Sequence, residues 1–383
     1  MKYNNRVLII LPHLSIGGTE NQTLNTAQAL VANGYDVTVL CIYRHISSVV
    51  EAYRTNGIKV MLLSPQYNNY GMVIRYHKSL DLIKFLYGGL KKCLMECRPN
   101  IIHVQYMTPG ATIILLLRYV FNHKKIITTA HTTADLYSNL YLIHFIQRYC
   151  TCAFTCITER AERSFFGNSQ LYSPELKLKK RGNHFTIYNN LPSYIAISDK
   201  PRQFNTPVTI GVVSRLERIK GMDLVVPAFA KVHARFPDSR LLVAGDGGLR
   251  SVMEEQVREN SLDEVVEFVG RQPQSALQSV YDRIDILLMP SRSEGFGLTA
   301  IEGMARGCAV VAADVGGLPE VVGGVGLLHK PEDIDDLAQK IECLLTDESR
   351  LGECSEAARK HVTRFSSETY SRLIADLYAK LSN

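Results

Sequence analysis

The chain has 383 residues, of which 46% are hydrophobic and 21% are charged, values typical of a globular protein with two domains. The longest apolar run, residues 111–117, is far shorter than the roughly 20 residues of a membrane-spanning helix, so composition excludes a disordered or membrane-spanning chain. Charge is uneven: residues 1–195 hold 21 Lys/Arg and 9 Asp/Glu, a net +12, whereas residues 196–383 hold 22 and 28, a net −6. This asymmetry indicates that the first half meets an anionic partner, the alternative being a solvated basic face.

The predicted elements alternate between strands and helices along the whole chain. Strands are predicted at 6–12, 36–43, 101–106, 125–132, 153–158 and 184–190, with a helix at 19–34. A second series follows at 208–216, 240–247, 265–272, 285–291, 309–317 and 325–330. The alternation predicts an α/β protein of two doubly wound, Rossmann-like domains. We expect an N-terminal domain at 1–195, a linker at 196–206, a C-terminal domain at 207–360, and a helix at 361–383 that packs back on the N-terminal domain.

The N-terminus and the cysteines indicate a cytoplasmic protein. The apolar run near the N-terminus is short and is followed at once by His13, which is not the pattern of a secretion signal. The nine cysteines are odd in number and lack paired metal-ligand spacing, as is typical of a reducing compartment.

Cations follow the predicted strands of the second half, where doubly wound sheets bind ligands. Arg215 and Lys220 lie in "SRLERIKG", after the strand that begins this series, and Arg271 follows "FVG". Two cations at one crevice suit an anion of the size of a diphosphate. If they stood alone, two ordinary surface cations would be an equally good interpretation.

The stretch "SEGFGLTAIE" at 293–302 adds backbone N–H donors and two carboxylates to these cations. A helix that begins near Leu298 would present the unpaired N–H groups of Gly297, Leu298 and Thr299 to an anion. Phosphates would repel carboxylates, so Glu294 and Glu302 are expected to contact hydroxyls on opposite sides of the diphosphate. That combination describes a nucleotide sugar, although Glu294 could instead complement the helix dipole and Glu302 could lie on a solvated helix face.

The stretch "PSRSEGFGLTAIEGMARGCAVVAADVGGLPE" resembles the donor-site motif of the retaining glycosyltransferases of family 4, which have the two-domain GT-B fold. The shared pattern is Glu, seven residues, Glu, and then Gly-Gly-x-Pro-Glu, and "SRLERIKG" and "VAGDGG" match further family signatures. The resemblance covers nearly the whole chain, strongly in 208–330 and weakly in 1–195. The usual Gly before the first Arg is Ser214, which weakens any assignment to a subfamily.

The resemblance implies that the two domains face each other across a cleft and gives roles to the C-terminal residues. Arg215 and Lys220 would bind the donor diphosphate and stabilise it as it leaves. Glu302 would hold the ribose hydroxyls, and Glu294 would contact the transferred sugar. The main chain at Arg271 would contact the base, and the N–H groups of Phe296, Gly297, Leu298 and Thr299 would meet the phosphate and the sugar.

In the N-terminal domain the resemblance implies that Gly17 and Gly18 lie close to the donor phosphate and the acceptor. His131 would lie beside the transferred sugar and the reacting centre. Asn190 keeps the amide of a family Asn-Gly pair, whose Gly is here Leu191.

The resemblance also implies a retaining reaction, for which we favour attack on the same face, with the departing phosphate taking the acceptor's proton. No cofactor or metal is expected, because the cations and backbone donors stabilise the leaving group. The segment 67–92 combines Tyr, Leu and Ile with Arg75, Lys78, Lys84, Lys91 and Lys92, and predicts a basic amphipathic surface for anionic lipid headgroups. We therefore expect a polyprenyl-diphosphate-linked glycan acceptor in O-antigen or capsule assembly, at the inner face of the cytoplasmic membrane.

Two other functions fit the same motifs. A sugar-nucleotide epimerase of the same architecture would alter the donor without an acceptor, and a non-catalytic nucleotide-sugar-binding subunit would bind the donor without turnover. Nucleic acid is not an expected partner, because no recognisable reading module accompanies the basic charge.

Overall fold

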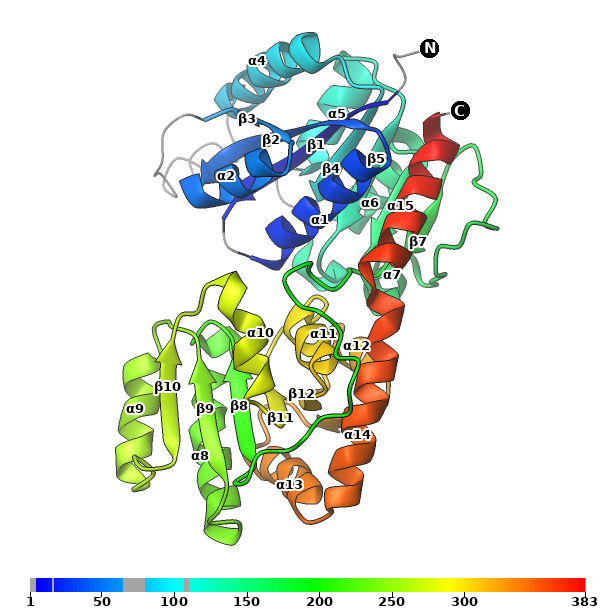
Figure 1. Cartoon of the computed structure of the whole chain (residues 1–383). Helices are drawn as coiled ribbons and strands as arrows, with labels where there is room; N and C mark the ends of the chain where they lie inside the picture. Colours follow the sequence, from blue (N-terminus) through cyan, green and yellow to red (C-terminus); the bar gives the residue numbers. More distant parts are fainter. Residues whose placement is uncertain (1–4, 16, 65–79, 107–109, 383) are drawn as a thin grey trace. The chain divides into compact units, whose positions relative to one another are not determined.

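The chain forms two compact units. The computed structural model describes residues 5–15, 17–64, 80–106 and 110–382. Unit 1 comprises Met1–Asn190 together with Ser367–Asn383, and unit 2 comprises Leu191–Ser366 (Figure 1). The chain therefore passes from one unit to the other twice, once after Asn190 and once after Ser366.

Unit 1 is built on a parallel sheet of seven strands in the order β3-β2-β1-β4-β5-β6-β7. The strands are β1 Arg6–Leu14, β2 Asp36–His45, β3 Lys59–Leu62, β4 Ile101–Tyr106, β5 Ile126–Ala130, β6 Ala153–Cys156 and β7 His184–Thr186. The helices and helical turns are α1 Gly18–Ala32, α2 Ser47–Thr55, α4 Leu80–Cys97, α5 Gly110–Leu115, η1 Leu116–Val120, η2 Ala134–Leu136, α6 Leu140–Phe145, η3 Ile146–Cys150, α7 Glu159–Phe166 and α15 Ser367–Ser382.

Strand β1 shows why helices cover both faces of this sheet. Successive side chains of a strand point to opposite faces, and β1 is apolar at almost every position. Val7 and Ile9 pack in the core that contains α1 and α15, whereas Leu8 and Ile10 pack in the core that contains α4 and α5. A strand that is apolar on both sides can be buried only at the centre of a helix-covered sheet.

Helix α15 comes from the far end of the chain and completes unit 1. It lies beside α1 (red and dark blue in Figure 1). Its residues Tyr370, Ile374, Leu377 and Tyr378 are buried in the core with β1. They fall on one face because residues three or four apart in a helix are neighbours.

Unit 2 has a parallel sheet of six strands in the order β10-β9-β8-β11-β12-β13. The strands are β8 Thr209–Val213, β9 Arg240–Ala244, β10 Val266–Gly270, β11 Ile286–Met289, β12 Ala309–Ala313 and β13 Leu327–His329. The helices and turns are η4 Arg218–Lys220, α8 Met222–Arg235, α9 Arg250–Glu259, α10 Gln274–Asp282, α11 Leu298–Ala305, α12 Leu318–Val322, α13 Ile334–Leu345, α14 Glu348–His361 and η5 Val362–Phe365.

The prediction of two doubly wound parallel units is confirmed. Every predicted strand is present, and the sequence patterns missed only β3 among the strands of the described residues. None of the four residues of β3 is fully buried, so this edge strand lacks the apolar run that marks the others. In each sheet the strand order reverses beside the first strand of the series, between β1 and β4 and between β8 and β11, which is where such folds bind ligands.

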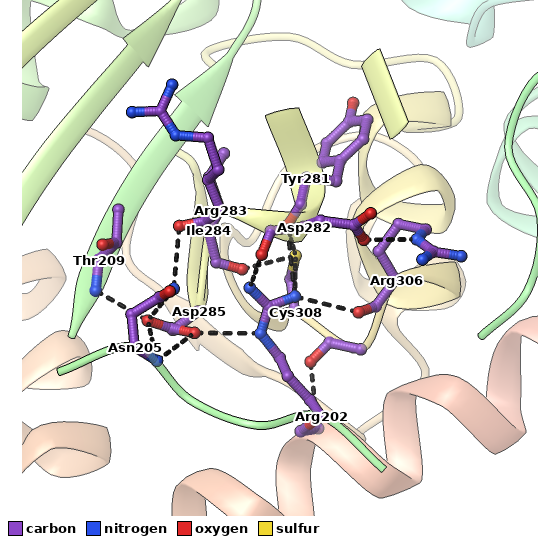
Figure 2. Close-up of polar contacts among 12 residues, drawn as sticks. Arg202, Asn205, Thr209, Tyr281, Asp282, Arg283, Ile284, Asp285, Arg306 and Cys308 are labelled. Carbon is purple, nitrogen blue, oxygen red and sulfur yellow. Dashed lines mark hydrogen bonds and ion pairs between the residues drawn. The ribbon is translucent and has the colours of Figure 1, made fainter. Parts of the chain in front are cut away.

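The segment 196–206, expected as a linker, is bound firmly to unit 2 (Figure 2). The Arg202 guanidinium donates to Asp285 Oδ1 at 3.0 Å and to the carbonyl oxygens of Asp282 and Arg306 at 2.9 and 3.0 Å. The Asn205 amide donates to Asp285 Oδ2 at 2.8 Å, and Asp285 is fully buried. These contacts make the segment a part of unit 2, and the division between the units falls earlier, after Asn190.

Candidate active site in unit 2

The loops after β8 and β11 meet at the point where the strand order of unit 2 reverses. Lys220 ends the loop after β8, and Glu294 lies in the loop after β11. The Lys220 Nζ atom lies 2.6 Å from Glu294 Oε2, and the two side chains are 21% and 16% exposed. The structure thus brings together two of the predicted site residues in a largely shielded ion pair.

The loop that carries Lys220 is clamped onto the β11 loop by residues that the sequence analysis missed. Gly221 has φ +68°, and a Cβ atom there would lie 1.9 Å from the Pro290 carbonyl oxygen, so only glycine fits. Arg292 donates to both carboxylate oxygens of Asp223 at 2.6 and 2.9 Å, and its backbone N–H bonds the Ile219 carbonyl at 2.9 Å. The hydrogen bond to Asp223, with one to Glu332, raises the pKa of Arg292 above its ordinary value. The sequence did offer a signal for Arg292, because it is a third cation and lies within the stretch "PSRSEGFG".

The first turn of α11 lies beside the same loops and presents free backbone donors. Gly297, with φ +104°, precedes the helix, and its carbonyl oxygen accepts from the N–H groups of Ala300 and Ile301. In the part of the chain that the structure describes, no partner is found for the N–H groups of Leu298 and Thr299. The Thr299 hydroxyl lies 3.5 Å from the Val213 carbonyl oxygen, which places this turn at the carboxyl end of β8. Such a helix N-terminus favours an anion.

The Gly-Gly-x-Pro-Glu loop packs directly on the backbone of Glu294. Gly316 has φ +52°, and a Cβ atom there would lie 1.8 Å from the Glu294 carbonyl oxygen. The Gly317 N–H donates to the same oxygen at 3.0 Å. Glycine at position 316 therefore lets the loop approach and fix the peptide that carries Glu294.

Glu302 is buried and bonded to two phenols. Its Oε1 accepts from the Tyr194 hydroxyl at 2.8 Å and its Oε2 from the Tyr281 hydroxyl at 2.5 Å. Burial raises the pKa of Glu302, while these two hydrogen bonds oppose the rise. The interpretation of Glu302 as a solvated helix residue is wrong, because the side chain is 5% exposed. Its contact with ribose stays a prediction, for which each oxygen keeps one further lone pair.

The remaining predicted residues of unit 2 are not drawn into these contacts. Arg215 is 61% exposed and pairs with Glu217, its Nη1 lying 2.7 Å from Oε1. No contact of Arg215 with Lys220 or Glu294 is found among the described residues, so the convergence of both cations stays a prediction. Arg271 is exposed after β10, and the Phe296 ring is buried edge-on against another ring, so only the Phe296 backbone can meet a ligand.

In unit 1, His131 follows β5 and is buried. Its Nε2 lies 2.6 Å from Gln105 Oε1, and burial lowers the pKa of the imidazole to about 4, so the ring is neutral near pH 7. Because Gln105 Oε1 can only accept, Nε2 carries the proton and Nδ1 is the free acceptor. A role beside the reacting centre stays a prediction.

The glycines and Asn190 of unit 1 lie near the starts of α1 and α15. Gly17 precedes α1, which begins at Gly18, and a Cβ atom at Gly17 would lie 2.6 Å from Glu20 Oε2. The buried Asn190 accepts from Gln22 Nε2 and donates to Ser367 Oγ, both at 3.1 Å. Its amide therefore ties the start of α15 to α1, and donor contact stays a prediction.

Both units match protein-family models. Residues 16–167 match the model described as Glycosyltransferase Family 4, and residues 194–361 match Glycosyl transferases group 1. A structure of Anabaena HepE in complex with UDP and glucose superimposes with a TM-score of 0.75 over 98% of this chain and 99% of that one, at 17% identity. Each unit thus matches a glycosyltransferase family model, and the chain has the GT-B fold.

The curated relatives differ in how much of their length they share with this chain. A D-inositol 3-phosphate glycosyltransferase of Corynebacterium aurimucosum is 36% identical over 46% of this chain and 45% of its own length. An uncharacterized glycosyltransferase of Methanocaldococcus jannaschii is 28% identical over 88% of this chain and 94% of its own. The chain thus spans less than half the length of the inositol phosphate enzyme. The predicted O-antigen or capsule role is not confirmed by these relatives.

The described residues contain neither a metal-type cluster nor a membrane-spanning helix. No group of three or more His, Cys, Asp and Glu side chains suited to a metal ion occurs among them. Within the same residues, no helix combines the length and the apolar character needed to cross a bilayer. The prediction that no cofactor is needed stays a prediction.

Proposed function

We propose that the chain is a retaining glycosyltransferase that moves a hexose or an N-acetylhexosamine from a UDP- or GDP-sugar to a hydroxyl of a glycan. The observation that carries the proposal is the contact of Lys220 with Glu294 beside the free N–H groups of α11. A cation and a helix N-terminus suit a diphosphate, and a carboxylate next to them suits sugar hydroxyls.

Leaving-group stabilisation is the main chemical task of such a site. As the bond between the anomeric carbon and the phosphate oxygen breaks, negative charge collects on the diphosphate. Lys220 and the first turn of α11 supply positive charge at fixed positions, so little reorganisation is needed when the charge develops. Arg215, which is exposed in this state, would join them through a change of side-chain rotamer.

The proposed step conserves the configuration at the anomeric carbon. The acceptor hydroxyl attacks on the face from which the diphosphate leaves, forming the new carbon–oxygen bond as the old one breaks. The acceptor's proton passes to a phosphate oxygen of the departing nucleotide. No enzyme carboxylate becomes bonded to sugar in this scheme, so a trapped glycosyl-enzyme would contradict it.

Donor binding must open the ion pair that fills the site. Phosphate oxygens would take Lys220 from Glu294, and hydroxyls of the transferred sugar would then satisfy Glu294. Because the carboxylate is only 16% exposed, leaving it unpaired would be costly. A nucleoside diphosphate without sugar should therefore bind less well than the complete donor.

For the acceptor we propose a polyprenyl-diphosphate-linked glycan in cell-surface polysaccharide synthesis, with the protein peripheral on the inner face of the cytoplasmic membrane. The net charge of +12 on residues 1–195 supports an anionic partner of this kind. The names of the relatives point to other acceptors, inositol 3-phosphate and, in a Mycobacterium tuberculosis protein 30% identical over 45% of this chain, glycogen.

A panel of UDP- and GDP-sugars tests the proposed function, with donor hydrolysis and thermal stabilisation as readouts. One donor should raise the melting temperature and be hydrolysed slowly, including in EDTA. The anomer of a product made with a simple acceptor, read by NMR, tests retention. An epimerised donor, or donor binding without hydrolysis or transfer, would contradict the proposal.

A further inference from the structure

Four aromatic side chains of unit 1 form an exposed ridge. Tyr141, Phe145 and Tyr149 are spaced four residues apart along α6 and η3 and are 90%, 41% and 42% exposed. Tyr119 of η1 is 59% exposed, and its ring lies 6.4 Å from that of Phe145, which in turn lies 5.2 Å from Tyr149. We call these four residues the aromatic ridge.

A groove lined by cations runs alongside the ridge. It has a volume of about 600 Å³, and its lining includes Arg148, Lys179 and Arg181, which we call the cationic groove, together with Tyr149. The Arg148 guanidinium lies over the Tyr149 ring, 5.8 Å from its centroid. The groove and the ridge therefore share an edge.

Electrostatics also connect the groove with the far side of the ridge. The pKa of the Tyr119 phenol is raised, mainly by desolvation and by a hydrogen bond with Cys150, and the charges of Arg118 and Arg181 oppose the rise. The Arg181 charge therefore acts at Tyr119 as well as in the groove. The ridge therefore has cations near Tyr119 as well as in the groove.

The groove holds no acid that could neutralise its cations. Its lining, within the described residues, contains neither Asp nor Glu. The nearby Glu162 is fully buried beneath it and accepts from Thr186 Oγ1 at 2.7 Å and contacts His184 Nδ1 at 2.6 Å. For Arg148, Lys179 and Arg181 no ion pair with a carboxylate is found in the described parts of the chain. The cations of the groove are therefore open to an anion from outside the chain.

Helix α4 also carries exposed apolar and basic side chains. The basic surface predicted at 67–92 lies partly outside the described residues, which include 80–92 but not Arg75 or Lys78. Leu82, Leu86 and Leu90 are buried in the core, whereas Leu80, Ile83, Phe85, Tyr87 and Met95 are 36% to 74% exposed. Lys84, Lys91 and Lys92 are exposed on the same helix, so α4 is the competing candidate for membrane contact.

We propose that the aromatic ridge and the cationic groove together form a membrane-docking surface for anionic lipids. The groove binds the phosphate groups of the lipid headgroups, and the ridge lies at the level of the headgroups, where amphipathic aromatic rings are favoured. The inference builds on the proposed lipid-linked acceptor, since it names the surface that would bring unit 1 to a membrane-bound substrate. Helix α4 is the alternative membrane surface, and its cations serve as the control.

Vesicle sedimentation with matched charge variants tests this surface. One variant carries Arg148→Gln, Lys179→Gln and Arg181→Gln, and the control carries Lys84→Gln, Lys91→Gln and Lys92→Gln on α4. With vesicles rich in phosphatidylglycerol, binding of the groove variant should weaken about a hundredfold, because each cation at an anionic surface contributes about fivefold. The control should weaken by much less, and phosphatidylcholine vesicles should bind neither protein.

Three outcomes would overturn the proposal. Equal weakening in both variants would mean that overall charge, and not this groove, attracts the membrane. Unchanged binding of the groove variant would mean that the cations of the groove do not contact the membrane. A groove variant that loses binding to single-stranded RNA more than to vesicles would make the occupant a nucleic acid. Donor hydrolysis is measured in parallel on wild-type protein, so failure of the proposed activity is seen separately.

A fluorescence experiment keeps the proposal testable even if the triple variant folds poorly. The chain contains no tryptophan, so a single introduced residue reports alone. Tyr141→Trp should shift to shorter emission wavelengths with anionic vesicles and be quenched by brominated lipid. Val252→Trp, at a 40% exposed position on α9 of unit 2, is the control and should not respond. Absence of quenching at position 141 while the protein sediments with vesicles would overturn the proposal.

Discussion

Replacing Lys220 with alanine tests the electrostatic basis of the proposed donor site. Lys220 Nζ lies 2.6 Å from a carboxylate oxygen and the side chain is 21% exposed, so its charge acts where water is largely excluded. Opposite unit charges about 3 Å apart interact by about 5 kcal/mol at an effective dielectric constant of about 20. Residual solvent access reduces this, and single preorganised donors are typically worth about 3–4 kcal/mol in a transition state. Turnover should therefore fall about 100- to 1,000-fold.

The assay measures release of the nucleoside diphosphate at saturating donor, with the melting temperature as a check that the variant folds. Lys231→Ala is a matched control, because Lys231 lies on α8 of the same unit and pairs with the exposed Asp335 at 2.8 Å. That control should keep full turnover. A folded Lys220→Ala protein with turnover within about threefold of wild type would refute the assignment of Lys220 to the leaving group.

Three further predictions concern residues that stabilise the two units or the loops of the proposed site. Asp285→Ala should lower the free energy of unfolding by about 3–5 kcal/mol in urea titrations, because it leaves Arg202 buried without its carboxylate; a loss below about 1 kcal/mol would contradict this. Gly316→Ala should weaken donor binding and lower the melting temperature, since its Cβ atom would press on the Glu294 carbonyl oxygen, and unchanged calorimetric affinity would argue against the loop's role. Burial lowers the pKa of His131 from 6.5 to about 4, so the unfolded state binds more protons between these values. Stability should therefore fall as pH drops through this window, less steeply in His131→Gln, when unfolding is followed by circular dichroism; equal slopes would refute the assignment.

Sequence patterns predicted those features that depend on short, continuous stretches of the chain. The strands of both sheets appeared as apolar runs because parallel strands covered on both faces are apolar at nearly every position. The Lys220 and Glu294 loops could be expected at one edge of the sheet because both follow strands of a parallel sheet, whereas the strand order that makes them neighbours comes from the structure. Edge strand β3, with little burial, gave no such run.

Features that depend on distant contacts could not be predicted in this way. The hydrogen bonds to Glu302 come from Tyr194, 108 residues away, and Tyr281, 21 residues away, and neither spacing has a periodic signature. The segment 196–206 interrupts the alternation of strands and helices, and its composition predicts a linker. Its attachment depends on Arg202 and Asp285, which are 83 residues apart and meet only in the folded unit.

The return of α15 to unit 1 has a consequence for biosynthesis. As the polypeptide leaves the ribosome, residues 191–366 emerge complete and can close into unit 2 while unit 1 still lacks the side chains of α15. Until residues 367–382 emerge, the apolar face of β1 that α15 covers lacks part of its cover. The domain translated first is thus the one finished last, and truncation near residue 366 should yield nascent chains that depend on chaperones.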